Sequence, residues 1–259
     1  MSQAANTINS AISAMEIVYP DSDGRPMADN TKQYQYIITI QVGLDSLFAS
    51  DPDVFVAADL FWYPVEGRPD IKTAPDVMVA FGRPKGHRGS YKQWEEGGIA
   101  PQVVFEILSP GNTWREMFDK RKFYERHGVK EYHLYDPDGG SLEIWQRAGR
   151  SLRPVEFEGE WLSPLLGVTL KLEDDGELSV YRPDGRKFLR PVEIDALAEQ
   201  ERARAEQEHA RAEQERERAE QERECAEQEH ARAEQERERA ERLAMRLREL
   251  GMDPDSLSA

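Results

Sequence analysis

Two short apolar runs stand near the middle of the chain, and each carries one carboxylate. The first is DVMVAF, in which Asp76 follows a proline, and the second is QVVFEIL, in which Glu106 stands between Phe105 and Ile107. Runs of this length and composition predict buried strands. Because an unpaired buried carboxylate costs several kcal/mol, each acid needs a compensating partner. A divalent cation shared by both is the first candidate.

The pattern on either side of these runs predicts a mixed α/β fold. Helices are predicted where apolar residues recur at helical spacing, and strands where they alternate between turn signals. In chain order, the predicted elements are a helix over 31–48 capped by Asp29 or Asn30, a strand over 54–63, the two apolar runs, a helix over 113–127 ended by Gly128, a hairpin of EYHLYD and LEIWQR, a strand pair of SLRPVE and GVTLKL, and a strand in GELSVY.

Between the two apolar runs lies a long polar excursion, residues 82–100. It exceeds the usual length of a loop, so it is either a functional segment beside a cleft or a partly ordered flap. A basic cluster at Arg83, Lys85, His87, Arg88 and Lys92 belongs to it. These side chains either line a cleft or are simply solvated.

The last quarter of the chain repeats. AEQE recurs every seven residues from position 205 to position 233, and alanine is almost its only apolar residue. Arginine often follows glutamate by three residues, so ion pairs within the helix support it. The repeat predicts a long, mostly solvated helix over 194–250 that forms a weak coiled coil or stays single. The predicted organisation is an arm over 1–25, a globular domain over 26–193, this helix, and a tail over 251–259.

Charge and cysteine content narrow the class of protein. The net charge is −16, and residues 1–195 alone hold 22 basic against 31 acidic side chains. A protein that grips duplex DNA normally shows a basic face, so this balance argues against such binding. The single cysteine, Cys225, suits a reducing cytoplasm. No apolar run of about eighteen residues is present, so we expect a soluble cytoplasmic protein without a membrane segment.

Two acids at neighbouring strand ends, followed by a lysine on a helix, are an arrangement that hydrolyses phosphodiesters with a metal ion. The carboxylates fix the ion, and the lysine orients or deprotonates the attacking water. The segments PDVMVAF, VVFEILSPGN and KRKFYERHGVKEYHLYDP resemble the Uma-two family, whose members are assigned as endonucleases of the PD-(D/E)XK superfamily. The resemblance covers roughly residues 26–190. It implies a restriction-endonuclease-like fold: a mixed sheet flanked by helices.

The chain departs from the superfamily pattern at one position. The usual lysine stands two residues after the glutamate, where this chain has Leu108. The resemblance implies that the lysine has moved to the following helix, at Lys120. Helix geometry supports this assignment, because at about 100° per residue Lys120 falls on the face of Met117 and Tyr124 while Lys122 falls away from it.

The predicted site therefore consists of Asp76 and Glu106 as metal ligands and Lys120 as the catalytic ammonium, with Mg²⁺ or Mn²⁺ as the cofactor. Glu116 lies near the same helix face. Asp59 is either a third acid of the site or the partner of a loop amide. His127 and His133 are candidate metal ligands because of their residue type. However, a lone histidine at a helix end or in a strand is more often structural.

Two functions remain open from the sequence. The first is a metal-dependent endonuclease acting on nucleic acid, with DNA expected before RNA. The second is a non-catalytic scaffold or adaptor with a degenerate nuclease fold, which acts through the C-terminal helix. That helix leaves room for a homodimer or for an unidentified protein partner.

Overall fold

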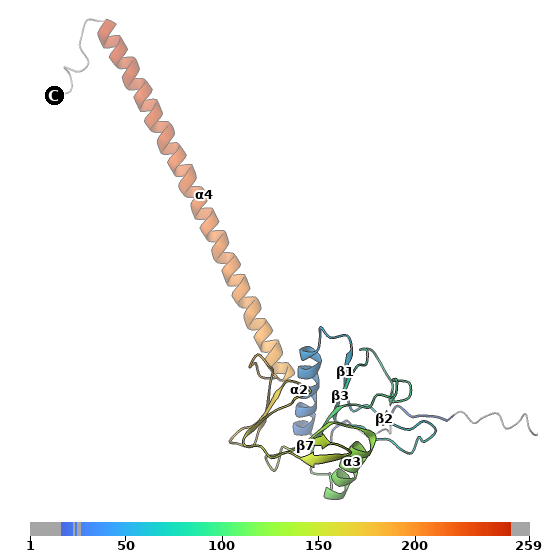
Figure 1. Cartoon of the computed structure of the whole chain (residues 1–259). Coiled ribbons are helices and arrows are strands. Elements are labelled where there is room, and N and C mark those ends of the chain that lie inside the picture. The colour runs from blue at the N-terminus through green and yellow to red at the C-terminus, as the bar shows by residue number, and fades with distance from the viewer. Residues whose placement is uncertain (1–16, 23, 25–26, 250–259) are drawn as a thin grey trace, which may run out of the picture. The chain divides into compact units, whose positions relative to one another are not determined.

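The computed structural model describes residues 17–22, 24 and 27–249 of the chain. The chain divides into two compact units, Met1–Ile194 and Asp195–Ala259 (Figure 1). Most of the predicted arm over 1–25 and all of the predicted tail over 251–259 lie outside the described residues. Among the residues that are described, no helix is both long enough and apolar enough to cross a membrane.

A six-stranded mixed sheet is the centre of the first unit, with the strand order β1-β3-β5-β6-β7-β8. These strands are β1 (Val54–Ala58), β3 (Val77–Phe81), β5 (Val103–Ile107), β6 (Glu131–Asp136), β7 (Ser141–Ala148) and β8 (Ser151–Pro154). Only β5 and β6 are parallel within this sheet. Parallel strands need a crossover, which α3 (Trp114–His127) provides. The mixed sheet predicted from the sequence is confirmed.

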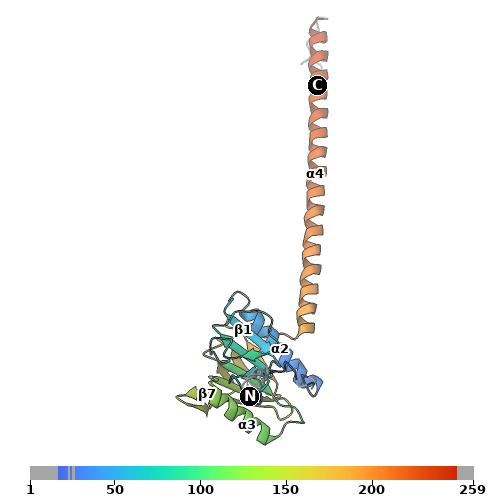
Figure 2. The ribbon, with the colours of Figure 1, turned by 90° about the vertical axis from the view of Figure 1, so that its right-hand side faces the viewer.

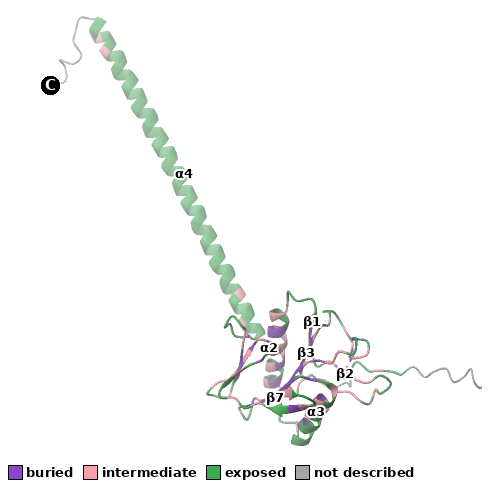
Figure 3. Ribbon diagram, viewed as in Figure 1, coloured by how far each residue is buried: buried purple, intermediate pink, exposed green. Residues whose placement is uncertain are grey.

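Helices cover the two faces of this sheet. Helix α2 (Thr31–Leu47) packs through Ile37, Ile40 and Leu44 on the face formed by the odd-numbered residues of β3 and β5. Helix α3 packs through Tyr124 on the opposite face, where the even-numbered residues of these strands point. Both helices are labelled in Figures 1 and 2, and Figure 3 shows that the buried residues concentrate between these layers. Strands buried on both faces explain why β3 is continuously apolar and why β5 is apolar apart from Glu106.

The helix ends follow their capping signals. Asn30, one of the two predicted caps, accepts a hydrogen bond from the backbone of Gln33 at the start of α2. Thr113 caps α3 in the same way by accepting from the backbone of Glu116. Gly128 ends α3 in the left-handed region with φ 101°. Glycine adopts this conformation without steric cost, so α3 ends where the sequence predicts.

The predicted strand over 54–63 is wrong as a single element. It breaks at Asp59, which has a left-handed φ of 47° and donates its backbone N–H to the carbonyls of Pro75 and Asp76. Aspartate tolerates this conformation better than a β-branched residue does. The chain then leaves the sheet, and β2 (Trp62–Tyr63) pairs in parallel with β4 (Tyr91–Lys92).

The predicted pairing of SLRPVE with GVTLKL is also wrong. β8 closes a short hairpin with β7. β10 (Thr169–Leu172) instead lies between β9 (Glu160–Leu162) and β11 (Leu178–Tyr181) in a separate three-stranded sheet. Closing a short loop costs less entropy than closing a long one, which favours the local partner in each case.

The excursion over 82–100 is tied down by one buried carboxylate. Glu96 accepts from Arg83 at 2.8 Å and from Arg88 at 2.5 Å, and the Arg88 guanidinium lies 4.0 Å from the centre of the Phe55 ring. Two further cations of the predicted basic cluster have acidic partners as well, Lys85 with Asp45 and Lys92 with Glu95. Most of this cluster therefore serves the structure and does not line a cleft.

Helix α4 (Pro191–Glu249) is continuous and matches the predicted C-terminal helix, with a start three residues earlier. Its ion pairs join residues four apart, as in Arg204 with Glu208 and Arg237 with Glu241. The sequence pattern led us to expect pairs three residues apart. Cys225 is a free thiol on this helix. Its weak coiled-coil pairing stays a prediction.

Gly43 of α2 is the point where Phe188 packs closely on this helix. A Cβ atom added at Gly43 would stand 2.1 Å from the Phe188 ring, which is only 5% exposed. We expect Gly43→Ala to destabilise the protein by about 1–3 kcal/mol, because a buried ring cannot move aside cheaply. Urea unfolding of the single variants Gly43→Ala and Phe188→Ala and of the double variant would measure this. If the losses of unfolding free energy in the two single variants add up in the double variant, this double-mutant cycle contradicts the contact.

Candidate active site

Three acids form a row across the ends of β1, β3 and β5. Val77 faces Ala58 on one side and Phe105 on the other. The next positions along these antiparallel ladders are therefore Asp59, Asp76 and Glu106. Even-numbered residues of β3 and β5 point toward α3, so Asp76 and Glu106 emerge on the side where α3 lies.

Glu106 is almost fully buried, with 2% exposure, and both of its carboxylate oxygens have partners. The Lys120 ammonium donates to Oε2 at 2.8 Å. The buried Tyr124 hydroxyl donates to Oε1. One turn of α3 separates these two donors, so the helix presents both to the same carboxylate. Glu106 is thereby held in a fixed orientation.

Asp76 lies beside Glu106 with less compensation. Its Oδ2 accepts the backbone N–H of Ile107 at 2.7 Å. Although the side chain keeps some solvent contact, protein surrounds the carboxyl group. Burial, followed by the negative charge of Glu106, raises the pKa of Asp76 to about 8, against the opposing effect of Lys120. Without a cation, Asp76 therefore binds a proton around neutral pH.

Lys120 is charged in this setting. Burial alone would lower the pKa of its ammonium, but Glu106 and Asp76 together outweigh burial and raise that pKa above its ordinary value. A group with a raised pKa does not act as a general base near neutral pH. Of the two roles considered for the lysine, orienting water or taking its proton, this environment favours orientation.

The helix face predicted for Lys120 is the face observed. Its side chain is 22% exposed and reaches Glu106, while that of Lys122 is 46% exposed and pairs with Glu125 on the surface. Met117 and Tyr124 are the buried residues of α3. The periodicity of the helix therefore distinguishes the two lysines, with Lys120 facing the sheet and Lys122 facing solvent.

A pocket of about 330 Å³ opens over these groups. Asp59, Asp76, Glu116 and Lys120 line it, so both additional candidate acids lie at the same opening. Glu116 also receives a weak hydrogen bond from Asn112 at 3.4 Å. In the described part of the chain, no cluster of three or more histidine, cysteine or acidic side chains is arranged to hold a metal ion.

Two polar residues that fix this site were not predicted from the sequence. Tyr124 holds Glu106, and the only signal for it was its spacing of four residues from Lys120. Gln33 of α2 donates through Nε2 to the carbonyl of Ile107 at 2.8 Å. Nothing in the local sequence of α2 indicates this contact, because the two residues are 74 positions apart.

The two histidines are structural. His133 is buried and stacks on Phe105 with 4.4 Å between ring centres. His127 packs against Phe123 at 4.5 Å and lies edge-on to Trp62. Neither histidine lines the pocket of the acids. Burial lowers the pKa of both, so each is held neutral near pH 7.

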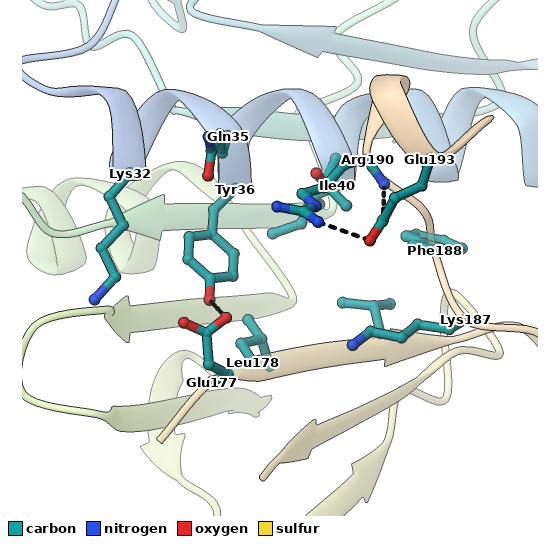
Figure 4. A pocket seen from close by; sticks show the side chains of 12 residues that line it. Lys32, Gln35, Tyr36, Ile40, Glu177, Leu178, Lys187, Phe188, Arg190 and Glu193 are labelled. Carbon is teal, nitrogen blue, oxygen red and sulfur yellow. Dashed lines mark hydrogen bonds and ion pairs between the residues drawn. The ribbon is translucent and has the colours of Figure 1, made fainter. Parts of the chain in front are cut away.

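A second pocket, of about 300 Å³, lies between α2 and β11 (Figure 4). The Tyr36 hydroxyl donates to Glu177 at 2.6 Å, and Arg190 pairs with Glu193 at 2.8 Å. Figure 4 shows these two pairs at the pocket, the first a hydrogen bond from a neutral hydroxyl to a carboxylate and the second an ion pair. Two acids and two lysines line this pocket, but Glu177 is held by Tyr36 and Glu193 by Arg190, and none of the described lysines is bonded to either acid. The candidate site is therefore the row of Asp59, Asp76 and Glu106, where Lys120 is bonded to Glu106.

Comparison with known proteins identified a family and a similarity to solved structures. The Uma2 family, described as "Putative restriction endonuclease", matches residues 25–181. A solved structure of "a putative nuclease belonging to DUF820 from Anabaena variabilis ATCC 29413" has a TM-score of 0.41 and 17% sequence identity. The match covers 56% of this chain and 81% of that one. No curated protein matches. Because the match to the Uma2 family extends over more than half of the length of this chain, the chain belongs to that family.

Proposed function

We propose that this chain is a metal-dependent endonuclease that hydrolyses phosphodiester bonds in nucleic acid, with DNA as the expected polymer. The observation that carries the proposal is the placement of Asp76 and Glu106 on adjacent strands with the Lys120 ammonium bonded to one of them. The description of the Uma2 family as restriction endonucleases supports it. The superfamily position after the glutamate is Leu108, so Lys120 supplies the ammonium.

The donor set fits a hard divalent cation. Asp76 and Glu106 would hold Mg²⁺ or Mn²⁺, both of which prefer carboxylate oxygens. Burial, followed by the negative charge of Glu106, raises the pKa of Asp76, and a cation bound beside this carboxylate would stabilise its ionised form. Asp59 and Glu116 line the same pocket and are candidates to complete the site. When bound, such an ion polarises a phosphoryl oxygen and acidifies water.

The residues of the chain have separable roles in this proposal. Asp76 must lose its proton before it can serve as a ligand. Tyr124 fixes the orientation of Glu106, and Lys120 places a positive charge beside the reacting phosphate and orients water. The nuclease activity belongs to residues 26–193, and helix α4 acts as a spacer or as an arm for self-association or a partner.

A non-catalytic adaptor is the second candidate function. The observation that favours it is the direct bond between Lys120 and Glu106, which is also what an ordinary structural salt bridge would show. In that case α4 would be the working element. The two proposals differ in whether a metal ion binds and whether nucleic acid is cut.

Metal binding and plasmid cleavage together test the proposal. We expect the intact protein to nick supercoiled plasmid with Mg²⁺ or Mn²⁺ and not with EDTA. Calorimetric titration with Mg²⁺ should give heat for the wild type and none for Glu106→Gln, which removes one of the two charges that hold the ion. The control is Glu143→Gln, an exposed glutamate of β7. A wild type that binds no ion and leaves the plasmid intact would favour the adaptor.

A further inference from the structure

The pocket of the acids continues into a second concavity of about 470 Å³. Both are lined by Lys72, Thr73, Glu116 and Lys120, so together they form one groove. The second part is bounded by the connection before β3 and by the first turns of α3, which add Arg115, Asp119 and Phe123. A polymer that places one phosphodiester at Asp76 and Glu106 would extend along this groove.

The cations of the groove differ in whether their charge is already engaged. Lys120 is bonded to Glu106. Lys72 lies 4.1 Å from the centre of the Phe61 ring. This contact holds the ammonium in place without neutralising it. Among the described residues, Lys120 forms an ion pair with a carboxylate, whereas Lys72 and Arg115 form none, although Asp119 follows Arg115 by four residues on α3.

We propose that Lys72 and Arg115 bind backbone phosphates of the nucleic acid next to the bond that is cut. This inference rests on the proposed nuclease function and names the part of the chain that holds its substrate. Phosphates are recognised by cations whose charge is not neutralised by carboxylates of the protein. Glu116 and Asp119 line the same groove, and their negative charge disfavours a phosphate directly beside them, so we place the phosphate contacts at Lys72 and Arg115.

Phosphate contacts at Lys72 and Arg115 also explain how a protein with a net negative charge could contact nucleic acid. Several cations of the first unit are paired with carboxylates, such as Arg83 and Arg88 with Glu96. Their charge adds nothing to phosphate affinity. A small number of unpaired cations placed in one groove is sufficient for contact at the cutting position, although the resulting affinity is low and sensitive to salt.

Fluorescence anisotropy with a short labelled DNA duplex tests the groove. Intact protein is titrated in Ca²⁺, which occupies oxygen sites, over a range of salt concentrations. For Lys72→Met and for Arg115→Met we expect weaker binding and a slope of log affinity against log salt that is smaller by about 0.9 in each case. Lys72→Arg should retain the slope. The controls are Lys130→Met and Arg150→Met, which remove exposed cations outside the groove and should leave the slope unchanged.

The outcomes separate this inference from the nuclease proposal. Slopes equal to the wild-type slope in both groove variants, or a wild type that does not bind the duplex, would overturn the groove. Binding that depends on Lys72 without any plasmid cleavage would support the groove and count against the nuclease. Thermal unfolding of each variant confirms that a lost contact, and not a lost fold, causes the change.

Discussion

Asp76→Asn is expected to abolish Mg²⁺-dependent cleavage and at the same time to stabilise the metal-free protein above neutral pH. The amide keeps the shape of the carboxylate but removes a negative charge and a metal ligand. Losing that ligand removes several kcal/mol of transition-state stabilisation, so cleavage should fall by about a thousandfold or more. Losing the charge also removes its repulsion from Glu106, which is one reason for the raised pKa of Asp76.

The pH dependence of this effect follows from the sign of the shift. The pKa of Asp76 is about 8 in the folded protein, whereas in the unfolded chain it takes the ordinary aspartate value of 3.8. The folded state therefore holds a proton that the unfolded state releases between these values. The contribution of this proton to the free energy of unfolding is complete below about pH 4 and is lost as the pH rises through 8. The free energy of unfolding falls by no more than about 1.4 kcal/mol per pH unit over this range. Asp76→Asn should lack this slope.

Urea unfolding at pH 5 and pH 8, with EDTA and with Mg²⁺, measures the effect. In the wild type the ion should offset the loss of stability at pH 8, because it replaces the proton. In Asp76→Asn it should have little effect. The control is Asp138→Asn, an exposed aspartate in the turn between β6 and β7. The assignment of Asp76 fails if the variant still cuts DNA, or if its stability falls with pH as steeply as that of the wild type.

Lys120→Met is expected to lower both activity and stability, whereas Lys122→Met should change neither by much. The first variant leaves Glu106, a nearly inaccessible carboxylate, without its ammonium. Breaking a buried pair in this way costs about 3–5 kcal/mol, less where the carboxylate can take up a proton. The second variant breaks an exposed pair with Glu125, which is worth about 1 kcal/mol or less.

A double variant distinguishes a catalytic lysine from a structural one. Lys120→Met combined with Glu106→Gln removes both charges, so it should recover much of the stability that Lys120→Met loses. Cleavage should not recover, because a ligand and the orienting charge are both missing. Calorimetry and plasmid nicking of the three variants provide the measurement. Equal losses of cleavage in Lys120→Met and Lys122→Met would indicate general attraction of phosphate in place of a defined role.

The central part of the fold and site was predictable because its signals are local. One acid interrupts each apolar run, so Asp76 and Glu106 stood out from the composition of their own strands. Helix periodicity then separated Lys120 from Lys122 through their positions relative to Met117. Gly128 marked the end of α3, and the start of α2 lies at Asn30, one of the two caps that the sequence offered.

What the sequence did not reveal depends on contacts between distant segments. Gln33 reaches the end of β5 from another layer of the fold, and Lys72 enters the groove from a connection without regular structure. The break at Asp59 is stabilised by carbonyls of the chain before β3, so the local alternation of residues could not show it. Alternation predicts that a strand exists but does not identify its partner, which is why the predicted pairing of SLRPVE with GVTLKL was wrong.

The small parallel pair of β2 and β4 limits what the excursion over 82–100 can do. The indole N–H of Trp62 in β2 donates to the side-chain oxygen of Gln93 at 3.1 Å. The Trp62 ring also lies parallel to the ring of Tyr124, whose hydroxyl donates to Glu106. Segments joined by buried contacts of this kind open as one cooperative unit, and amide hydrogen exchange would detect a single free energy of opening. We therefore expect the excursion not to open over the groove as an independent lid, so that access to the acids depends on the groove itself.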